Sequence, residues 1–186
     1  MRIHILGASG AGTTTLGVAL AKKLDIHFYD SDDFFWLPSD PPYNVKRPVQ
    51  DRVRLLAENL AQYDSWVLSG SLVDWSEEIE PLFTHIIFVS LDQEIRLQRI
   101  AERERMRFGA RIEAGGDMCG QSKEFLDYAA RYESGDMDIR SRARHEQWMG
   151  RFDWPILRLD SMQPVQSLVS ESVAWLARNP YDSAHS

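Results

Sequence analysis

Several features that define other classes of protein are missing from this sequence. Cys119 is the only cysteine, so no disulfide forms within the chain, and we expect the protein in the reducing cytoplasm. No apolar run reaches membrane-spanning length, and no secretory signal pattern precedes the first expected strand. Lysine is scarce, at 4 residues against 17 arginines, and the net charge is −7. We therefore expect neither a membrane nor a nucleic acid as a partner.

What remains is the composition of a globular protein. The chain has 186 residues, of which 44% are hydrophobic and 26% charged, enough for one domain with a buried core. We expect a single domain over residues 1–186, as a monomer or a homodimer. The excess of arginine suits recognition of phosphate or carboxylate groups.

The N-terminal stretch passes from an apolar strand through a glycine-rich turn into a helix. Residues 7–14 read Gly-Ala-Ser-Gly-Ala-Gly-Thr-Thr, which fits the phosphate-binding pattern G-x-x-x-x-G-K-S/T except at Thr13, where lysine is expected. Glycines bring backbone N–H groups close to an anion, and the helix N-terminus adds its positive dipole end. Thr14 has the hydroxyl that ligates Mg²⁺ in this motif. The residues predicted to bind ATP are Gly7, Ala8, Ser9, Gly10, Ala11, Gly12, Thr13, Thr14 and Thr15.

The missing lysine requires a positive charge from elsewhere in the fold. Lys22 and Lys23 cannot supply it, because they lie on the order of 15 Å further along the helix. The loop resembles that of phosphoribulokinases, which also carries threonine at this position. The resemblance implies that a loop without lysine can belong to an active kinase.

Strand and helix patterns alternate along the chain. We expect strands at 2–7, 26–30, 65–69, 85–90 and 155–159, and helices at 12–24, 49–63, 92–107, 122–149 (interrupted near 134–135) and 165–178. This alternation predicts an α/β fold, a three-layer P-loop domain whose five-stranded parallel sheet has helices on both faces. Ligands bind at the carboxyl ends of such strands, so the loops after the first four strands meet in one site.

An acidic turn, Asp30-Ser31-Asp32-Asp33, follows the second strand. Carboxylates at this edge can hold Mg²⁺ or accept a proton from an attacking hydroxyl, although a solvated acidic turn before a helix is the alternative. The stretch 28–32 resembles the segment that shikimate kinases place there. That resemblance implies that Asp30 lies near the metal with Thr14, and that Asp32 binds a substrate hydroxyl. We expect Asp32 or Asp33 to orient or deprotonate the acceptor.

A wider resemblance covers residues 1–110. The stretch Asp32–Trp36, together with Trp66 and Gly70, is similar to a group of small adenylate-kinase-like proteins that includes topology-modulation proteins. The kinase resemblance implies the strand order 2-3-1-4-5. The chain departs from shikimate kinases in having Ser69-Gly70-Ser71 instead of a triple glycine, which disfavours shikimate as the acceptor.

Arginines concentrate in residues 96–111, followed by a glycine-rich stretch. In small P-loop kinases, a lid at this place supplies arginines that close over the phosphates. We expect a lid at residues 103–121, with Arg103 or Arg107 supplying the charge missing at Thr13. The alternative is an exposed helix whose arginines pair with nearby glutamates. Arg140 and Arg144 are a weaker pair of candidates, and the alternative for them is a solvated helix.

The predicted acceptor site joins Asp32 to Trp36, Arg47 and Gly70, and Arg52 is a second cation that can contact an acidic acceptor. The aromatic residues 34–36 and 43 either wall this pocket or pack the cap over the sheet. The sequence as a whole predicts transfer of the γ-phosphoryl group of Mg·ATP to a small-molecule or nucleotide acceptor. The alternative is a nucleotide-binding switch or regulatory protein that has lost transfer activity, which the threonine at position 13 favours.

Overall fold

The computed structural model describes residues 1–75 and 77–180. Five parallel strands form one sheet in the order β2-β3-β1-β4-β5, which confirms the predicted fold class and strand order. The strands are β1 (Arg2–Gly7), β2 (His27–Asp30), β3 (Trp66–Ser69), β4 (His85–Ser90) and β5 (Ile156–Asp160). β1 is central, since Ile3 lies opposite Val67 of β3 and His85 of β4.

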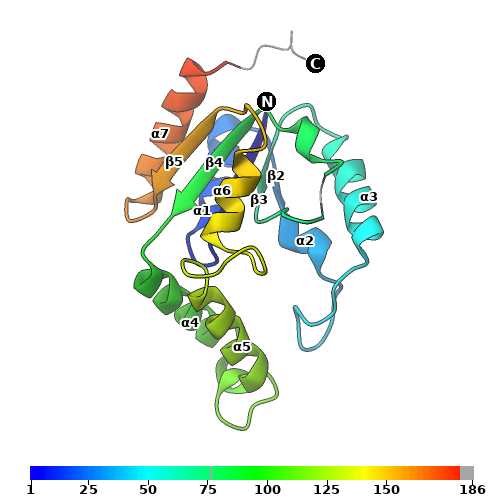
Figure 1. Cartoon of the computed structure of the whole chain (residues 1–186), viewed down its shortest axis with the longest axis vertical. Helices are drawn as coiled ribbons and strands as arrows, with labels where there is room; N and C mark the ends of the chain where they lie inside the picture. Colours follow the sequence, from blue (N-terminus) through cyan, green and yellow to red (C-terminus); the bar gives the residue numbers. More distant parts are fainter. Residues whose placement is uncertain (76, 181–186) are drawn as a thin grey trace.

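Helices cover both faces of this sheet. They are α1 (Thr13–Leu24), α2 (Ser31–Phe35), α3 (Val49–Leu60), α4 (Gln93–Phe108), α5 (Cys119–Ala130), α6 (Arg142–Met149) and α7 (Val165–Arg178), with the short 3₁₀ helices η1 (Glu80–Leu82) and η2 (Gly109–Ile112). Figure 1 shows α7 and α6 on opposite sides of the sheet. It also shows α4 and α5 extending beyond the carboxyl ends of β4 and β5, so the residues of the expected lid (103–121) lie beyond that edge of the sheet.

Two apolar cores form because alternate side chains of a strand point to opposite faces. Ile3 and Ile5 of β1 pack with Leu16 and Leu20 of α1 and with α7. Leu6 packs on the other face, in a cluster that includes residues of α3 and α6. The apolar strand β4 contributes to both clusters, as expected for a parallel strand buried on both sides.

The helix expected over 122–149 is two helices, α5 and α6, separated by residues 131–141. The break is longer than the sequence indicates, and it contains Gly135, whose backbone N–H bonds back to the Arg131 carbonyl. The acidic turn is itself part of a short helix, α2 (Ser31–Phe35), which is not among the helices predicted from the sequence. Its first turn is capped because Asp30 accepts a hydrogen bond from the Asp32 backbone N–H.

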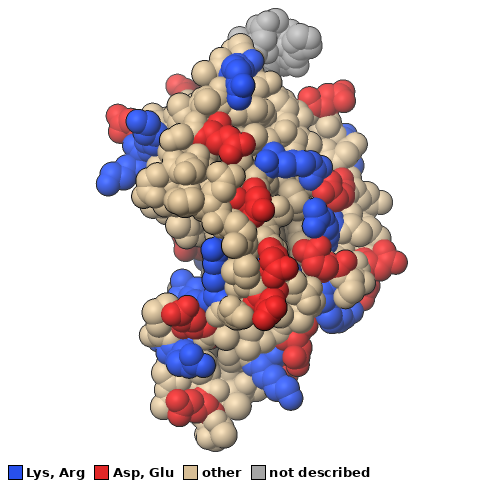
Figure 2. All heavy atoms as spheres, turned by 90° about the vertical axis from the view of Figure 1, so that its left-hand side faces the viewer, with Lys and Arg blue, Asp and Glu red and all other residues tan. Residues whose placement is uncertain are grey.

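Within residues 1–75 and 77–180, no helix has the length and apolar character needed to cross a membrane. Lys and Arg side chains intermix with Asp and Glu over the face shown in Figure 2. Such a pattern is typical of a solvated surface.

Candidate active site

The phosphate-binding loop connects β1 to α1 and depends on two glycines with positive φ. Gly10 has φ +81° and Gly12 has φ +93°, values that residues with a Cβ rarely adopt. At Gly10 a Cβ would also come within 2.7 Å of the Arg96 carbonyl oxygen. The loop therefore lies against α4 on one side and opens into a cleft on the other. All nine predicted nucleotide-binding residues, 7–15, line this cleft.

Thr14 and Asp30 meet at the floor of the cleft, as the topology predicts. Thr14 Oγ1 donates a hydrogen bond of 2.8 Å to Asp30 Oδ2, and Ser69 Oγ donates one of 3.2 Å to the same oxygen. The donor set is a hydroxyl and a carboxylate, which are hard oxygen ligands. Mg²⁺ usually takes only one or two carboxylates from protein and completes its shell with water and substrate phosphates, so these residues fit that ion.

Asp32 and Asp33 follow Asp30 at the start of α2, and both line the cleft. The Asp32 side chain lines the cleft, and partial desolvation by the cleft walls raises the pKa of its carboxyl. The Asp30 carboxylate raises that pKa further. Desolvation and Asp30 also raise the pKa of Asp33. A carboxyl whose pKa lies above its ordinary value holds a proton more tightly, which suits a general base.

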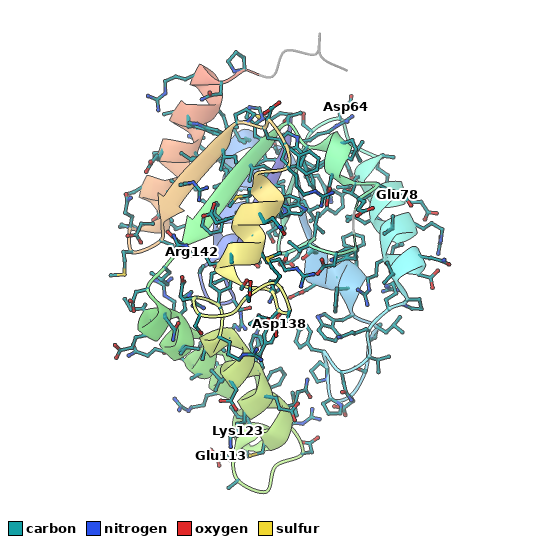
Figure 3. All side chains as sticks on the ribbon, in the orientation of Figure 1. Asp64, Glu78, Glu113, Lys123, Asp138 and Arg142 are labelled. Carbon is teal, nitrogen blue, oxygen red and sulfur yellow. The ribbon has the colours of Figure 1, made fainter. Side chains whose placement is uncertain are left out.

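Two cations oppose the shift at Asp32. The guanidinium groups of Arg140 and Arg103 each lower the pKa of the Asp32 carboxyl, so both act on it through space. Arg103 comes from α4 and Arg140 from the segment between α5 and α6. Figure 3 shows Asp138 of the same segment lying between α5 and α6. Two arginines from distant segments thus lie close enough to Asp32 to influence its carboxyl electrostatically.

The arginines of the lid segment differ in their surroundings. Arg103 and Arg107, the two arginines predicted to act from a lid, both line the cleft. Arg103 Nη2 lies 3.8 Å from Glu104, and the buried Arg103 Nε has no hydrogen-bond partner within residues 1–75 and 77–180. Arg96, in the same arginine-rich stretch, is fully buried. Its Nη1 donates a hydrogen bond of 3.2 Å to the Ser9 carbonyl of the phosphate-binding loop.

Arg140 and Arg144 do not share a helix face, because α6 begins only at Arg142. Arg140 Nη2 donates a hydrogen bond of 2.9 Å to Ser9 Oγ in the phosphate-binding loop. Arg144 lines the cleft and is ion-paired with Asp74. The weakest pair of sequence candidates thus includes a residue that touches the loop directly.

The residues predicted to bind the acceptor lie around α2 and the end of β3. Trp36 and Gly70 line the cleft there together with Phe35 and Tyr43, whereas Phe34 is buried in the core. The aromatic stretch therefore contributes to both the pocket and the packing. Arg47 does not line the cleft, and its Nε donates to the Phe34 carbonyl at 2.9 Å.

Several cleft residues were missed by sequence reasoning. Lys46 and Trp75 line the cleft, and Ser71 continues the loop after β3. Ser71 Oγ lies 3.2 Å from Nε2 of His145, whose Nδ1 is 2.9 Å from the Tyr132 hydroxyl. The position of Ser71, one residue past Gly70 at a strand's carboxyl end, was the available signal.

The expected lid touches the loop after α2 across the cleft. Arg111 makes ion pairs of 2.6 Å with Asp40 of that loop and with Asp117 of its own segment. Gln121 donates a hydrogen bond of 2.8 Å to the Pro42 carbonyl. Figure 3 shows Glu113 and Lys123 at the end of this region away from the sheet. In this structure the two sides of the cleft are in direct contact.

Comparison with known proteins identifies the family to which the chain belongs. A family model described as an AAA domain matches residues 3–118. The chain is 38% identical over 177 residues to the uncharacterized protein YqaC of Bacillus subtilis, covering 95% of this chain and 98% of that one. It is 31% identical over 132 residues to a probable gluconokinase of Xenopus tropicalis, covering 56% of this chain and 70% of that one.

Solved kinase structures share the fold. A shikimate kinase from Acinetobacter baumannii in complex with shikimate has a TM-score of 0.56 at 16% identity, covering 97% of this chain and 95% of that one. A gluconokinase from Sinorhizobium meliloti has a TM-score of 0.52 at 18% identity, covering 95% of this chain and 91% of that one. The glycine-rich loop, the parallel sheet order and these relatives agree: the chain belongs to the AAA-domain family within the P-loop kinase-like superfamily.

Proposed function

We propose that the protein transfers the γ-phosphoryl group of Mg·ATP to a small-molecule or nucleotide acceptor. The observation that carries the proposal is one cleft of about 1480 Å³ lined by the phosphate-binding loop, Asp30, Asp32 and lid arginines. Single-ligand pockets are roughly 300–1,000 Å³, so this cleft has room for a nucleotide and a second ligand. The gluconokinase and shikimate kinase relatives support this class of reaction.

The nucleotide half of the cleft binds phosphates through the backbone. N–H groups of the loop and the N-terminus of α1 would hold the β- and γ-phosphates. Thr14 and Asp30 would hold Mg²⁺, which neutralises charge on the phosphates when it is bound. Gly12, at the N-cap of α1, has no side chain that would cover the helix terminus.

Asp32 accepts the proton in this proposal. The acceptor hydroxyl oxygen forms a bond to the γ-phosphorus while the bond from that phosphorus to the β–γ bridging oxygen breaks. The hydroxyl proton passes to Asp32, and ADP leaves with the bond's electron pair. Arg103 and Arg107 line the same cleft and would neutralise charge on the transferred group, which is the larger part of catalysis in phosphoryl transfer.

Arg52 supports an acceptor with an acidic group. Its side chain lines the cleft with only 6% of its surface exposed, and its guanidinium lies 3.8 Å from the centre of the Phe35 ring. Its Nε donates to the Arg47 carbonyl, and no carboxylate pairs with it in the described part of the chain. A desolvated cation without an anion favours a ligand carboxylate or phosphate beside it.

The test is ADP release from Mg·ATP, screened against nucleosides, nucleoside monophosphates and hydroxy acids, including gluconate and shikimate. We expect one class to stimulate release, and Asp32→Asn to reduce the stimulated rate at least 100-fold. The matched control is Asp127→Asn, an exposed residue of α5 outside the cleft. Tight ATP binding with no stimulation by any acceptor would instead support the nucleotide-binding switch that Thr13 favours.

A further inference from the structure

The phosphate-binding loop lacks its cation, and the fold must supply one if ATP is bound. Thr13 occupies the lysine position, and its side chain carries no charge. The β- and γ-phosphates together carry several negative charges, which backbone N–H groups alone neutralise only in part. Among the described residues, seven lysine and arginine side chains line the cleft: Lys46, Arg52, Arg99, Arg103, Arg107, Arg140 and Arg144. Arg52 and Arg99 donate to the backbone carbonyls of Arg47 and Ser161, and Arg144 is paired with Asp74, which leaves Lys46, Arg103, Arg107 and Arg140 as cations that could approach the phosphates.

Arg140 is the cation among these that bonds to the loop. Its Nη2 donates a hydrogen bond of 2.9 Å to Ser9 Oγ, two residues after the loop begins at Gly7. Lys46 lies on the acceptor wall, where it forms a β-bridge with Trp36. The guanidinium of Arg103 is 3.8 Å from the Glu104 carboxylate, and Arg107 is exposed on α4. Of these four cations, Arg140 is therefore the one that a hydrogen bond holds against the loop in the described residues, whereas the buried Arg96 bonds to the Ser9 carbonyl from the side of α4.

Tyr128 fixes the base of the Arg140 side chain. The Arg140 backbone N–H donates to the Tyr128 hydroxyl at 3.2 Å, and its guanidinium carbon lies 6.0 Å from the Tyr128 ring centre. Within residues 1–75 and 77–180, no carboxylate oxygen lies within ion-pair distance of the Arg140 guanidinium. Its neighbours behave otherwise, since Arg142 pairs with Glu133 and Arg144 with Asp74. The Arg140 guanidinium thus lines the cleft with no described carboxylate in ion-pair contact, and an anion that it influences is Asp32, whose pKa it lowers through space.

We infer that Arg140 supplies, from the segment between α5 and α6, the positive charge that lysine supplies in other phosphate-binding loops. The inference rests on the proposed nucleotide site. Ser9 holds the guanidinium at the loop's edge, where its planar array of N–H groups can bind two phosphate oxygens at once. Because Arg140 lies beyond the lid segment, phosphates bound by both Arg140 and the loop would hold the segment between α5 and α6 against the loop.

Nucleotide binding tests this role without any need for turnover. Isothermal titration with Mg·ATP compares the wild type with Arg140→Ala, and we expect the dissociation constant of the variant to be at least tenfold higher. The matched control is Arg142→Ala, an arginine two residues away that pairs with Glu133, and it should bind Mg·ATP within twofold of the wild type. Equal affinity of Arg140→Ala and the wild type would overturn the inference.

A rescue experiment separates lost charge from lost structure. Adding Thr13→Lys to Arg140→Ala returns a cation to the loop by the other route, and we expect it to restore most of the lost affinity for Mg·ATP. Weak binding by the double variant, despite a thermal transition like that of the wild type, would contradict the inference. If no acceptor ever stimulates ADP release, the proposed phosphoryl transfer fails, whereas these binding results still decide the role of Arg140.

Discussion

Thr14 Oγ1 donates a 2.8 Å hydrogen bond to Asp30 Oδ2, which joins the first turn of α1 to the last residue of β2. The two residues are 16 positions apart and come together because α1 returns the chain to the neighbouring part of the sheet. The same oxygen accepts from Ser69 at the end of β3. Three elements thus fix the carboxylate beside the phosphate-binding loop.

The first prediction follows from this pair. Asp30→Asn keeps the size of the side chain but removes its charge, so we expect the Mg²⁺ concentration for half-maximal ATP turnover to rise at least tenfold. Magnesium titrations at fixed ATP measure the effect. The control is Asp25→Asn, at the other end of α1, where asparagine tolerates the observed φ of 54°. An unchanged magnesium requirement in Asp30→Asn would show that this carboxylate does not hold the ion.

The second prediction concerns pH. Asp32 must be ionised to accept a proton, so the rate rises as pH rises through its pKa, and that pKa is raised by desolvation and by Asp30. We expect an acid limb in kcat/KM above the range of an ordinary aspartate. Arg103 lowers the same pKa, so Arg103→Ala should move the limb to higher pH. A limb that stays in place in Arg103→Ala, or that persists in Asp32→Asn, would remove Asp32 from the role of base.

The third prediction concerns acid stability. Burial lowers the pKa of His145 to about 3 and that of His4 to about 4, and both side chains are fully buried. Each histidine stays neutral in the folded state while the unfolded chain takes up a proton near pH 6.5. The free energy of unfolding therefore falls as pH drops below 6.5, and the loss continues until the folded-state pKa is reached.

The magnitude is about 1.4 kcal/mol per pH unit for each histidine once the unfolded form is protonated. The His145→Gln variant takes up one proton fewer on unfolding than the wild type. Between pH 5.5 and 4, the free energy of unfolding of this variant should therefore depend on pH less steeply than that of the wild type, by about 1.4 kcal/mol per pH unit. Urea unfolding at several pH values gives both slopes, and the carboxylates contribute alike to each protein. Equal slopes for His145→Gln and the wild type would contradict the buried, neutral state of His145.

The fourth prediction tests the contact across the cleft. Arg111 pairs with Asp40 and Asp117 at the surface, so Arg111→Ala should increase amide hydrogen exchange in residues 37–45 and 109–121. The wild type should show the same increase at high salt, because exposed ion pairs are screened. Arg105→Ala, on the exposed side of α4, serves as the control. No change in either segment would show that this contact does not hold the lid.

The local parts of the site could be predicted from the sequence. The loop is a contiguous pattern, and Asp30 and Asp32 follow a recognisable strand, so the rule that ligands bind at carboxyl ends places them together. The sequence prediction placed Arg47 in the acceptor site, but Arg52 lines the cleft instead, because packing of α3 (Val49–Leu60) turns the Arg52 side chain inward and Arg47 precedes that helix. Arg52 is buried on the cleft side, while Arg47 bonds to backbone carbonyls.

Contacts between segments far apart in the chain could not be predicted from the sequence. Arg140 and Ser9 are separated by 131 positions, and the contact requires the segment between α5 and α6 to lie against the loop. A pattern of charges along one segment does not show which distant group each arginine meets. The same limit applies to His145, whose neighbours Ser71 and Tyr132 come from a strand end and from the segment after α5.

The central claim is that the γ-phosphoryl group reaches an acceptor. Incubation of the protein with γ-labelled Mg·ATP and the best acceptor from the screen, followed by separation of the products, locates the label directly. The account predicts a labelled phosphate ester of the acceptor in the wild type, and its loss in Asp32→Asn. Label found only in ATP and inorganic phosphate, with every acceptor class, would contradict phosphoryl transfer as the function.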